Sequence, residues 1–154
     1  MFREMRRKEK QLSHEQSIEI LKKCEYGVLS VVGDNGYAYG VPLSYVYVDN
    51  KIYFHSALTG YKLDCIEYNN KVSFCVVGDT KLLPDKFDTE YESVIVFGRA
   101  QEVTGEENYT AHIELLKKYS ADYLEEGKKY LERAGKNTRI FKIDIEHMTG
   151  KLGR

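Results

Sequence analysis

Residues 51–77 limit the fold of this chain most, because a short helical pattern there lies between two strand patterns. Lys51–Ser56 is rich in β-branched and aromatic residues, which is typical of a strand. Tyr61–Tyr68 carries apolar residues at helical spacing, and residues 71–77 return to a strand pattern. The stretch therefore predicts a strand, a short helix and a second strand.

The start of the predicted helix combines features of a phosphate site. Thr59 supplies a hydroxyl, Gly60 precedes the helix, and Lys62 adds a full positive charge. Free backbone N–H groups at a helix N-terminus also favour an anion. The same residues suit a solvent-facing turn, so this pattern alone leaves both interpretations open.

The composition excludes several classes of protein. The chain has 154 residues and a net charge of -1, which fits one domain without a strongly basic surface for nucleic acid or membranes. The apolar runs are short, so we expect no membrane-spanning helix, no signal peptide and a cytoplasmic location. The cysteines and histidines show no metal-ligand spacing, so we predict free thiols and no metal site. These residues are Cys24, Cys65, Cys75, His14, His55, His112 and His147.

The N-terminal part of the chain predicts an arm and one capped helix. Residues 1–12 are highly charged, and either a frayed tail or an arm packed along the rest of the chain suits them. Ser13 and Gln16 form a capping box, which predicts a helix that starts there. We expect Gly27 to close this helix in a left-handed conformation. Its inner face would carry Ile18, Leu21 and Cys24.

The next segment predicts a three-stranded meander. Asn35 and Gly36 favour a hairpin turn between strands 28–32 and 37–48, because this pair adopts positive φ readily. Pro42 interrupts the second strand and marks a bulge or a sheet edge, since proline cannot donate a hydrogen bond. The third strand is Lys51–Ser56.

The remaining pattern predicts about six strands in all, which suits an antiparallel barrel with peripheral helices. After residue 77 we expect a loop at 78–92, a strand at 93–103, a helix at 106–119, a helix or helix-turn at 120–134, a strand at 139–145 and a tail at 149–154.

Several short motifs follow one another between Met5 and Lys151. They are Met-Arg-Arg-Lys at 5–8, Tyr-Gly-Val-Leu at 26–29, Val-Pro at 41–42, Tyr-Phe-His at 53–55 and Thr-Gly-Lys at 149–151. Their order and spacing resemble the flavin-binding split-barrel superfamily of pyridoxamine 5'-phosphate oxidase. Within it, the resemblance is to the branch named after 5-nitroimidazole resistance proteins.

This resemblance implies an antiparallel, Greek-key-like split β-barrel formed by residues 13–154, preceded by the charged arm at 1–12. It also implies a homodimer with FMN in a groove between the subunits. The implied cofactor-binding residues are Val41, Pro42, Leu43, Ser44, His55, Ser56, Ala57, Gly60, Tyr61, Lys62 and Ser93.

The resemblance assigns these residues to three places that we expect to converge. The backbone at residues 41–44 would line the edge of the flavin ring. His55 and Ser56 would act with Lys62 at the phosphate, and Ser93 would lie near the ribityl chain or the ring.

The chain departs from the oxidase at two positions. Tyr61 stands where the oxidase has an arginine, so one cation of the phosphate site is missing. Either the Tyr61 hydroxyl or another basic residue (Arg6, Arg7 or Arg99) replaces it, or FMN binds more weakly. The C-terminal segment also lacks the arginine and histidine cluster that holds pyridoxamine phosphate in the oxidase, which predicts that the protein lacks this activity.

The function implied by the resemblance is an FMN-dependent reductase of small electron-poor compounds, such as nitroimidazoles, with NAD(P)H or another donor. If Phe54 packs into the barrel, strand alternation directs His55 to the outer groove as the catalytic candidate. A structural histidine is the other interpretation. The rival functions are a non-enzymatic flavin- or haem-binding store or sensor and a cofactor-free binding module.

Overall fold

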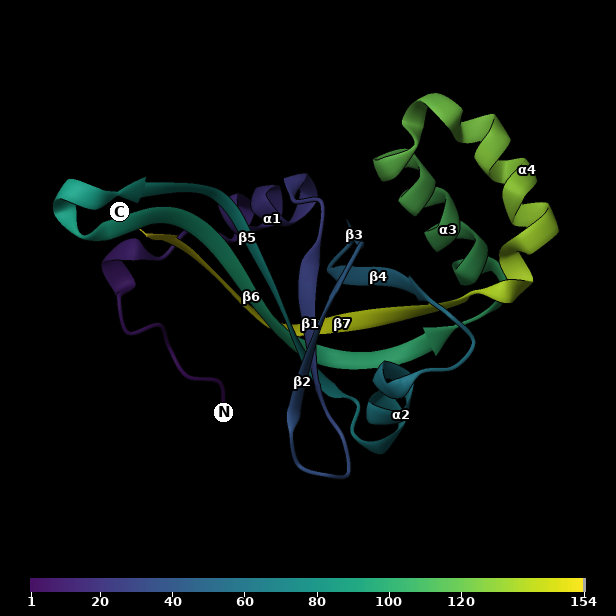
Figure 1. Cartoon of the computed structure of the whole chain (residues 1–154), viewed down its shortest axis with the longest axis horizontal. Coiled ribbons are helices and arrows are strands. Elements are labelled where there is room, and N and C mark those ends of the chain that lie inside the picture. Colours follow the sequence, from purple (N-terminus) through teal and green to yellow (C-terminus); the bar gives the residue numbers. More distant parts are fainter. Residues whose placement is uncertain (154) are drawn as a thin grey trace.

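The computed structural model, which describes residues 1–153, is built around one antiparallel sheet of seven strands (Figure 1). The strands lie in the order β2-β1-β5-β6-β7-β4-β3. The two outermost strands follow one another in the chain with only Ser44 and Tyr45 between them. The sheet therefore curls towards closure as a split barrel, which confirms the predicted fold class. Its strands are β1 Gly27–Val32, β2 Ala38–Leu43, β3 Val46–Val48, β4 Lys51–Ser56, β5 Lys71–Leu83, β6 Asp88–Val103 and β7 Arg139–Gly153.

Strand alternation divides the barrel into an inner and an outer face. On β4, Ile52 and Phe54 are fully buried in the main core, whereas His55 is exposed on the opposite face. Tyr53 lies on the same outer face as His55 and belongs to a second apolar cluster. The predicted inward direction of Phe54 and outward direction of His55 are therefore confirmed.

Helix α1 (His14–Lys23) begins as the sequence predicts. The Ser13 hydroxyl accepts a hydrogen bond from the Gln16 backbone N–H at 3.1 Å, and the Gln16 side chain returns one to Ser13 at 2.9 Å. Ile20 and Leu21 on this helix are buried in the main core. α1 therefore contributes to the core that fills the barrel.

Helices α3 (Gly105–Tyr119) and α4 (Leu124–Ala134) form a helical hairpin beside the barrel, at the upper right of Figure 1. Ala111 and Leu115 of α3 pack on the outer face of the sheet. Their partners in this second cluster are Val46, Tyr53, Val103 and Ile140. Helix α3 thus covers part of the outer face, from which His55 projects.

The predicted helix between two strands is confirmed as α2 (Tyr61–Tyr68), where Leu63, Cys65 and Ile66 are buried. Four single 3-10 turns complete the secondary structure of residues 1–153. They are Lys8–Lys10, Pro84–Lys86, Ala121–Tyr123 and Gly135–Asn137.

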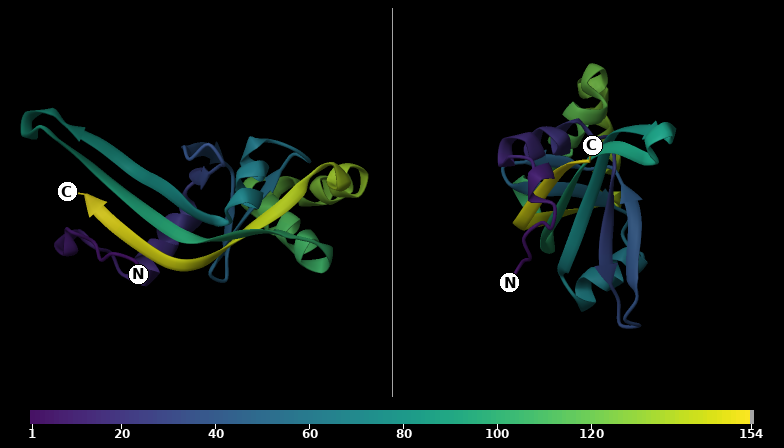
Figure 2. Two further views of the ribbon diagram at one scale, coloured as in Figure 1. Left: turned by 90° about the horizontal axis from the view of Figure 1, so that it is seen from below. Right: turned by 90° about the vertical axis from the view of Figure 1, so that its left-hand side faces the viewer.

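The predicted loop at 78–92 and the predicted tail at 149–154 are wrong where the structure describes them. β5 and β6 continue as a long hairpin whose turn places Phe87 at a φ of 52° (Figure 2). β7 runs on to Gly153 and pairs there with Tyr91. Most side chains of these segments are polar or charged, and the few apolar ones lack a strand pattern. Pairing with neighbouring strands, as between Lys81 and Glu90, determines their conformation.

Two local predictions near β1 are also wrong. Helix α1 ends at Cys24 in an extended conformation, and Gly27 belongs to β1. A Cβ atom at Gly27 would lie 2.3 Å from Cζ of Phe74, so close packing explains this glycine. The predicted strand at 37–48 splits into β2 and β3 on opposite edges of the sheet, so the three strands form no meander.

The charged arm lies along β7. Gln11 pairs with Lys151, and the Leu12 N–H donates to the Gly150 carbonyl at 2.9 Å. The Phe2 ring stacks on His147 with 4.8 Å between ring centroids. The structure therefore favours the packed arm over the frayed tail. No helix within residues 1–153 is long and apolar enough to cross a membrane.

Candidate functional site

Lys62 lies in the first turn of α2 and carries a charge that the chain does not neutralise. Its side chain is partly buried, and its Nζ atom lies 5.7 Å from the centroid of the Phe54 ring. Burial lowers the pKa of Lys62. None of the ion pairs within residues 1–153 includes it. A partly desolvated ammonium without a carboxylate favours an anionic ligand.

Two further residues at the end of β4 belong to this region. Ser56 is buried, with 5% of its surface exposed, while His55 is exposed on the outer face. Partial enclosure by the surrounding protein lowers the pKa of His55, and repulsion from His112 and Lys62 lowers it further. The His55 imidazole is therefore held in its neutral form near neutral pH. We call Lys62, His55 and Ser56 the Lys62 site.

His112 on α3 supports the outer face beneath His55. Its Nδ1 lies 3.1 Å from the Asn108 carbonyl, a contact in which Nδ1 must donate. Nε2 then faces the Thr138 hydroxyl at 3.2 Å. Burial lowers the pKa of His112, and the Asn108 hydrogen bond partly opposes this effect. His112 is thus a buried, neutral and hydrogen-bonded imidazole.

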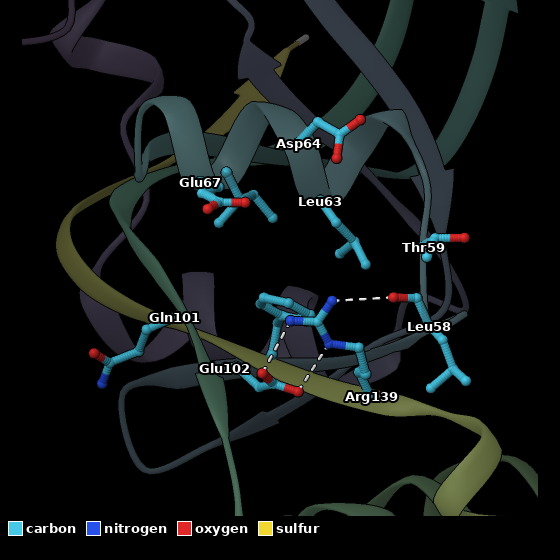
Figure 3. A pocket seen from close by; sticks show the side chains of 10 residues that line it. Leu58, Thr59, Leu63, Asp64, Glu67, Gln101, Glu102 and Arg139 are labelled. Carbon is cyan, nitrogen blue, oxygen red and sulfur yellow. Dashed lines mark hydrogen bonds and ion pairs between the residues drawn. The ribbon is translucent and has the colours of Figure 1, made fainter.

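A cavity of about 310 Å³ lies between α2 and the ends of β6 and β7 (Figure 3). Arg139 donates two hydrogen bonds to Glu102, at 2.9 and 3.0 Å, and a third to the Leu58 carbonyl at 3.1 Å. Its charge is neutralised, and Asp64 and Glu67 add negative charge to the lining. This cavity therefore does not suit a phosphate group. Its lining residues are Leu58, Thr59, Leu63, Asp64, Ile66, Glu67, Gln101, Glu102, Arg139 and Phe141.

Arg139 is the residue that the sequence analysis missed. Its bond to Leu58 attaches the loop before α2 to β7, and so it positions the turn that carries Thr59 and Gly60. Glu102 lies 37 residues before Arg139, so no local pattern indicates this pair. Only the register of β6 against β7 brings the two side chains together.

The structure places the predicted site residues in two separate regions of the chain. Pro42 is exposed on β2, an outermost strand, which confirms the edge position predicted for it. Ser93 is buried on β6 and pairs with Lys151. Val103 and His55 both pair with Ile140, so Val103 marks the level of His55 on β6. Ser93 lies ten residues before Val103, which is about 33 Å along the strand. One chain therefore does not bring Ser93 to the Lys62 site.

The remaining predicted residues lie in two segments of the chain. Ala57 and Gly60 are exposed in the loop before α2, and Val41, Leu43 and Ser44 are partly buried at the end of β2.

None of the proposed replacements for the missing arginine lies beside Lys62 in one chain. The Tyr61 ring contacts Tyr39 edge-on at 5.0 Å, and its hydroxyl points towards Gly33. Arg99 pairs with Glu146 at 3.2 Å. Arg6 and Arg7 belong to the arm, which lies at the Ser93 end of β6.

Within residues 1–153, no group of His, Cys, Asp or Glu side chains is arranged to hold a metal ion. The Lys62 site therefore combines an ammonium outside any ion pair of the described chain, a neutral imidazole and a buried hydroxyl, which suit an anionic organic ligand.

Comparison with solved structures finds the same fold in several proteins. One is described as a 5-nitroimidazole antibiotic resistance protein from Bacteroides thetaiotaomicron; the identity is 22%, 93% of this chain and 86% of that chain are covered, and the TM-score is 0.81. A FAD-binding protein from Mesorhizobium loti has 25% identity, 94% and 97% coverage and a TM-score of 0.67. A FAD- and haem-binding protein from Mycobacterium smegmatis has 15% identity, 94% and 74% coverage and a TM-score of 0.70.

No curated protein matches the sequence. The sequence profile of the family described as pyridoxamine 5'-phosphate oxidase matches residues 13–152, which is nearly the whole chain. This extent confirms the resemblance found in the motifs, and the chain belongs to the pyridoxamine 5'-phosphate oxidase family.

Proposed function

We propose that the protein binds FMN and reduces small electron-poor compounds, nitroimidazoles among them, with NAD(P)H or another donor. The observation that carries this proposal is the uncompensated charge of Lys62 at the start of α2. The flavin in the name of the Mesorhizobium loti protein and the nitroimidazole in that of the Bacteroides protein support it.

The residues of the Lys62 site fit the phosphate of FMN. Lys62 would supply a charge-assisted hydrogen bond, and the first N–H groups of α2 add donors. The buried Ser56 hydroxyl would add another. We expect FAD to bind more weakly, because its adenylate would have to extend from a phosphate enclosed by these groups.

His55 would accept and donate a proton at this site. A bound flavin would supply the electron transfer that small-molecule reduction needs. The neutral His55 imidazole lies on the outer face, and it can take a proton and then donate it where negative charge develops on the acceptor. Lys62 would hold the cofactor at a fixed distance from it.

We propose that the active form is a homodimer with FMN between the subunits. The outer face of β5 and β6 exposes Val77, Ile95 and Phe97, each with at least 41% of its surface accessible. Exposed apolar side chains of this kind favour a partner, and a second copy would bring its Ser93 to the Lys62 site. The three free cysteines agree with a cytoplasmic location, which we also propose.

A non-enzymatic flavin- or haem-binding store or sensor is the second candidate. The neutral imidazole of His55 favours it, because haem iron is ligated by neutral histidine. Turnover separates the two functions: a reductase consumes NAD(P)H in the presence of a nitroaromatic acceptor, whereas a store does not.

Fluorescence titration of the protein with FMN tests the proposal. We expect saturable quenching at one FMN per chain, weaker binding of FAD, and no oxidation of pyridoxamine phosphate. Sedimentation at micromolar concentration should show a dimer. Absence of saturable FMN binding would refute flavin binding, and a flavin-loaded monomer would refute the shared site.

A further inference from the structure

A second basic region lies at the opposite end of β6 from the Lys62 site. There the arm covers a cavity of about 200 Å³ on the outer face of β6 and β7. Arg6 and Arg7 line it from the arm, Ser93 from β6, and Thr149 and Lys151 from β7; Met5 and Ile95 supply its apolar wall. We call this cavity the arm pocket.

Strand register explains why these side chains meet. Ser93 pairs with Lys151 and Ile95 pairs with Thr149, so the four side chains lie side by side on one face. Val94 and Val96, which alternate with them, are buried in the core. The pairing of the arm with β7 then holds the two arginines over this face.

The lining is positively charged and contains no carboxylate. Arg7 pairs with Glu9, but neither Arg6 nor Lys151 takes part in an ion pair within residues 1–153. Lys151 donates to the Tyr91 hydroxyl at 3.0 Å, which leaves further donors of its ammonium available. Ser93, with 8% of its surface exposed, places a hydroxyl at the floor of the cavity.

We propose that the arm pocket binds an oxyanion, namely the phosphate or carboxylate group of a small molecule. Two unpaired cations and hydroxyl donors that line one partly open cavity are the chemistry that such a group requires. The group has two sources: an independent small anion, or the phosphate of a flavin held mainly by the partner copy.

Pyrophosphate binding to the flavin-free protein tests this inference without relying on the proposed function. Calorimetric titration at constant ionic strength would compare the wild type with Arg6→Gln and Lys151→Gln, and with Lys129→Gln as a control on the exposed face of α4. We expect each pocket variant to bind about 10-fold more weakly, the effect of one charge-assisted hydrogen bond, and the control to match the wild type.

Equal affinity in all four proteins would overturn the inference, and so would a loss confined to Lys62→Ala, because the anion would then lie at the Lys62 site alone. Thermal unfolding without pyrophosphate controls for folding, and Arg6→Lys should restore most of the affinity because it restores the charge.

Flavin binding distinguishes the two sources. If the pocket receives the phosphate of the partner's flavin, Arg6→Gln weakens FMN binding but leaves riboflavin binding unchanged. If it takes an independent anion, FMN affinity is unchanged in both variants, and pyrophosphate binds as well to the FMN-loaded protein as to the flavin-free one. Either result supports the oxyanion site, provided that pyrophosphate binding is lost as expected.

Discussion

The Lys62 site and the arm pocket concentrate positive charge in different ways. At the Lys62 site a single ammonium is partly buried, and the imidazole beside it is neutral. In the arm pocket the cations are more numerous, and Arg6 and Arg7 are exposed on an arm held by few contacts.

This difference predicts two kinds of anion binding. A desolvated charge interacts strongly with its ligand and is weakly screened, so a single substitution there should have a large effect. Exposed charges act together and are screened by salt, so each contributes less. The first kind suits a cofactor that stays bound, and the second suits a ligand that exchanges.

The largest expected effect concerns His55, which has no counterpart in the arm pocket. His55→Gln should keep the fold and most of the FMN affinity, yet slow reduction of a nitroaromatic acceptor by about 100-fold, the lower range for loss of a general acid. Stopped-flow reoxidation of the flavin-loaded proteins across pH measures this. The pKa of His55 lies below its ordinary value of 6.5, so the wild-type rate should change as the pH falls below about 6.5, and the variant should lack this step. Matching rates and pH profiles would assign His55 a structural role.

Lys62→Ala should weaken FMN binding by roughly 10- to 100-fold, because the variant loses one charge-assisted hydrogen bond in a partly desolvated place. Fluorescence titration measures the affinity, and Lys129→Ala is the matched control. Unchanged affinity would show that the phosphate binds elsewhere, and the arm pocket would be the next place to test.

The buried histidine behind the Lys62 site predicts a pH-dependent stability. The pKa of His112 in the folded protein lies below its ordinary value of 6.5, so protonation favours the unfolded chain. Stability is therefore full above about pH 6.5 and is lost as the pH falls towards the folded-state pKa. His112→Gln should cost about 1 kcal/mol at pH 8, through its lost hydrogen bonds, and flatten this pH dependence. Urea unfolding of both proteins at several pH values measures the free energy of unfolding and its dependence on pH. If this dependence were the same in the wild type and the variant, His112 would not be its source.

Salt should have the smallest effect, and it compares the two regions directly. Raising ionic strength from 0.1 to 1 M shortens the Debye length from about 10 to about 3 Å. We expect FMN affinity to fall by a few-fold and pyrophosphate affinity of the arm pocket to fall by more. Parallel titrations measure how each affinity depends on salt concentration. A steeper salt dependence for FMN would contradict the inference that the charge of Lys62 is screened less than the charges of the arm pocket.

The sequence predicts the strand and the helix that carry the Lys62 site, because their signals are local. The β-branched and aromatic residues of β4, the spacing of Leu63 and Ile66, and Lys62 in the first turn all lie within 18 residues. The bounds of β4 and α2 agree with the prediction for the same reason.

The arm pocket and the Glu102–Arg139 pair could not be predicted, because register brings their members together from distant parts of the chain. The polar hairpin of β5 and β6 was predicted as a loop, since its strands are stabilised by pairing and not by side-chain pattern. Whether Ser93 reaches the Lys62 site depends on a second copy, which a single sequence does not specify.

The pairing of Gln11 with Lys151 also sets the time at which the arm pocket can form. These residues are 140 positions apart, so during synthesis Gln11 cannot pair until the ribosome has added Lys151 of β7. At about 5–20 residues per second, this delay is on the order of 10 s. Through this interval Arg6 and Arg7 have no strand to lie against. The pocket therefore cannot be assembled before β7 has been synthesised.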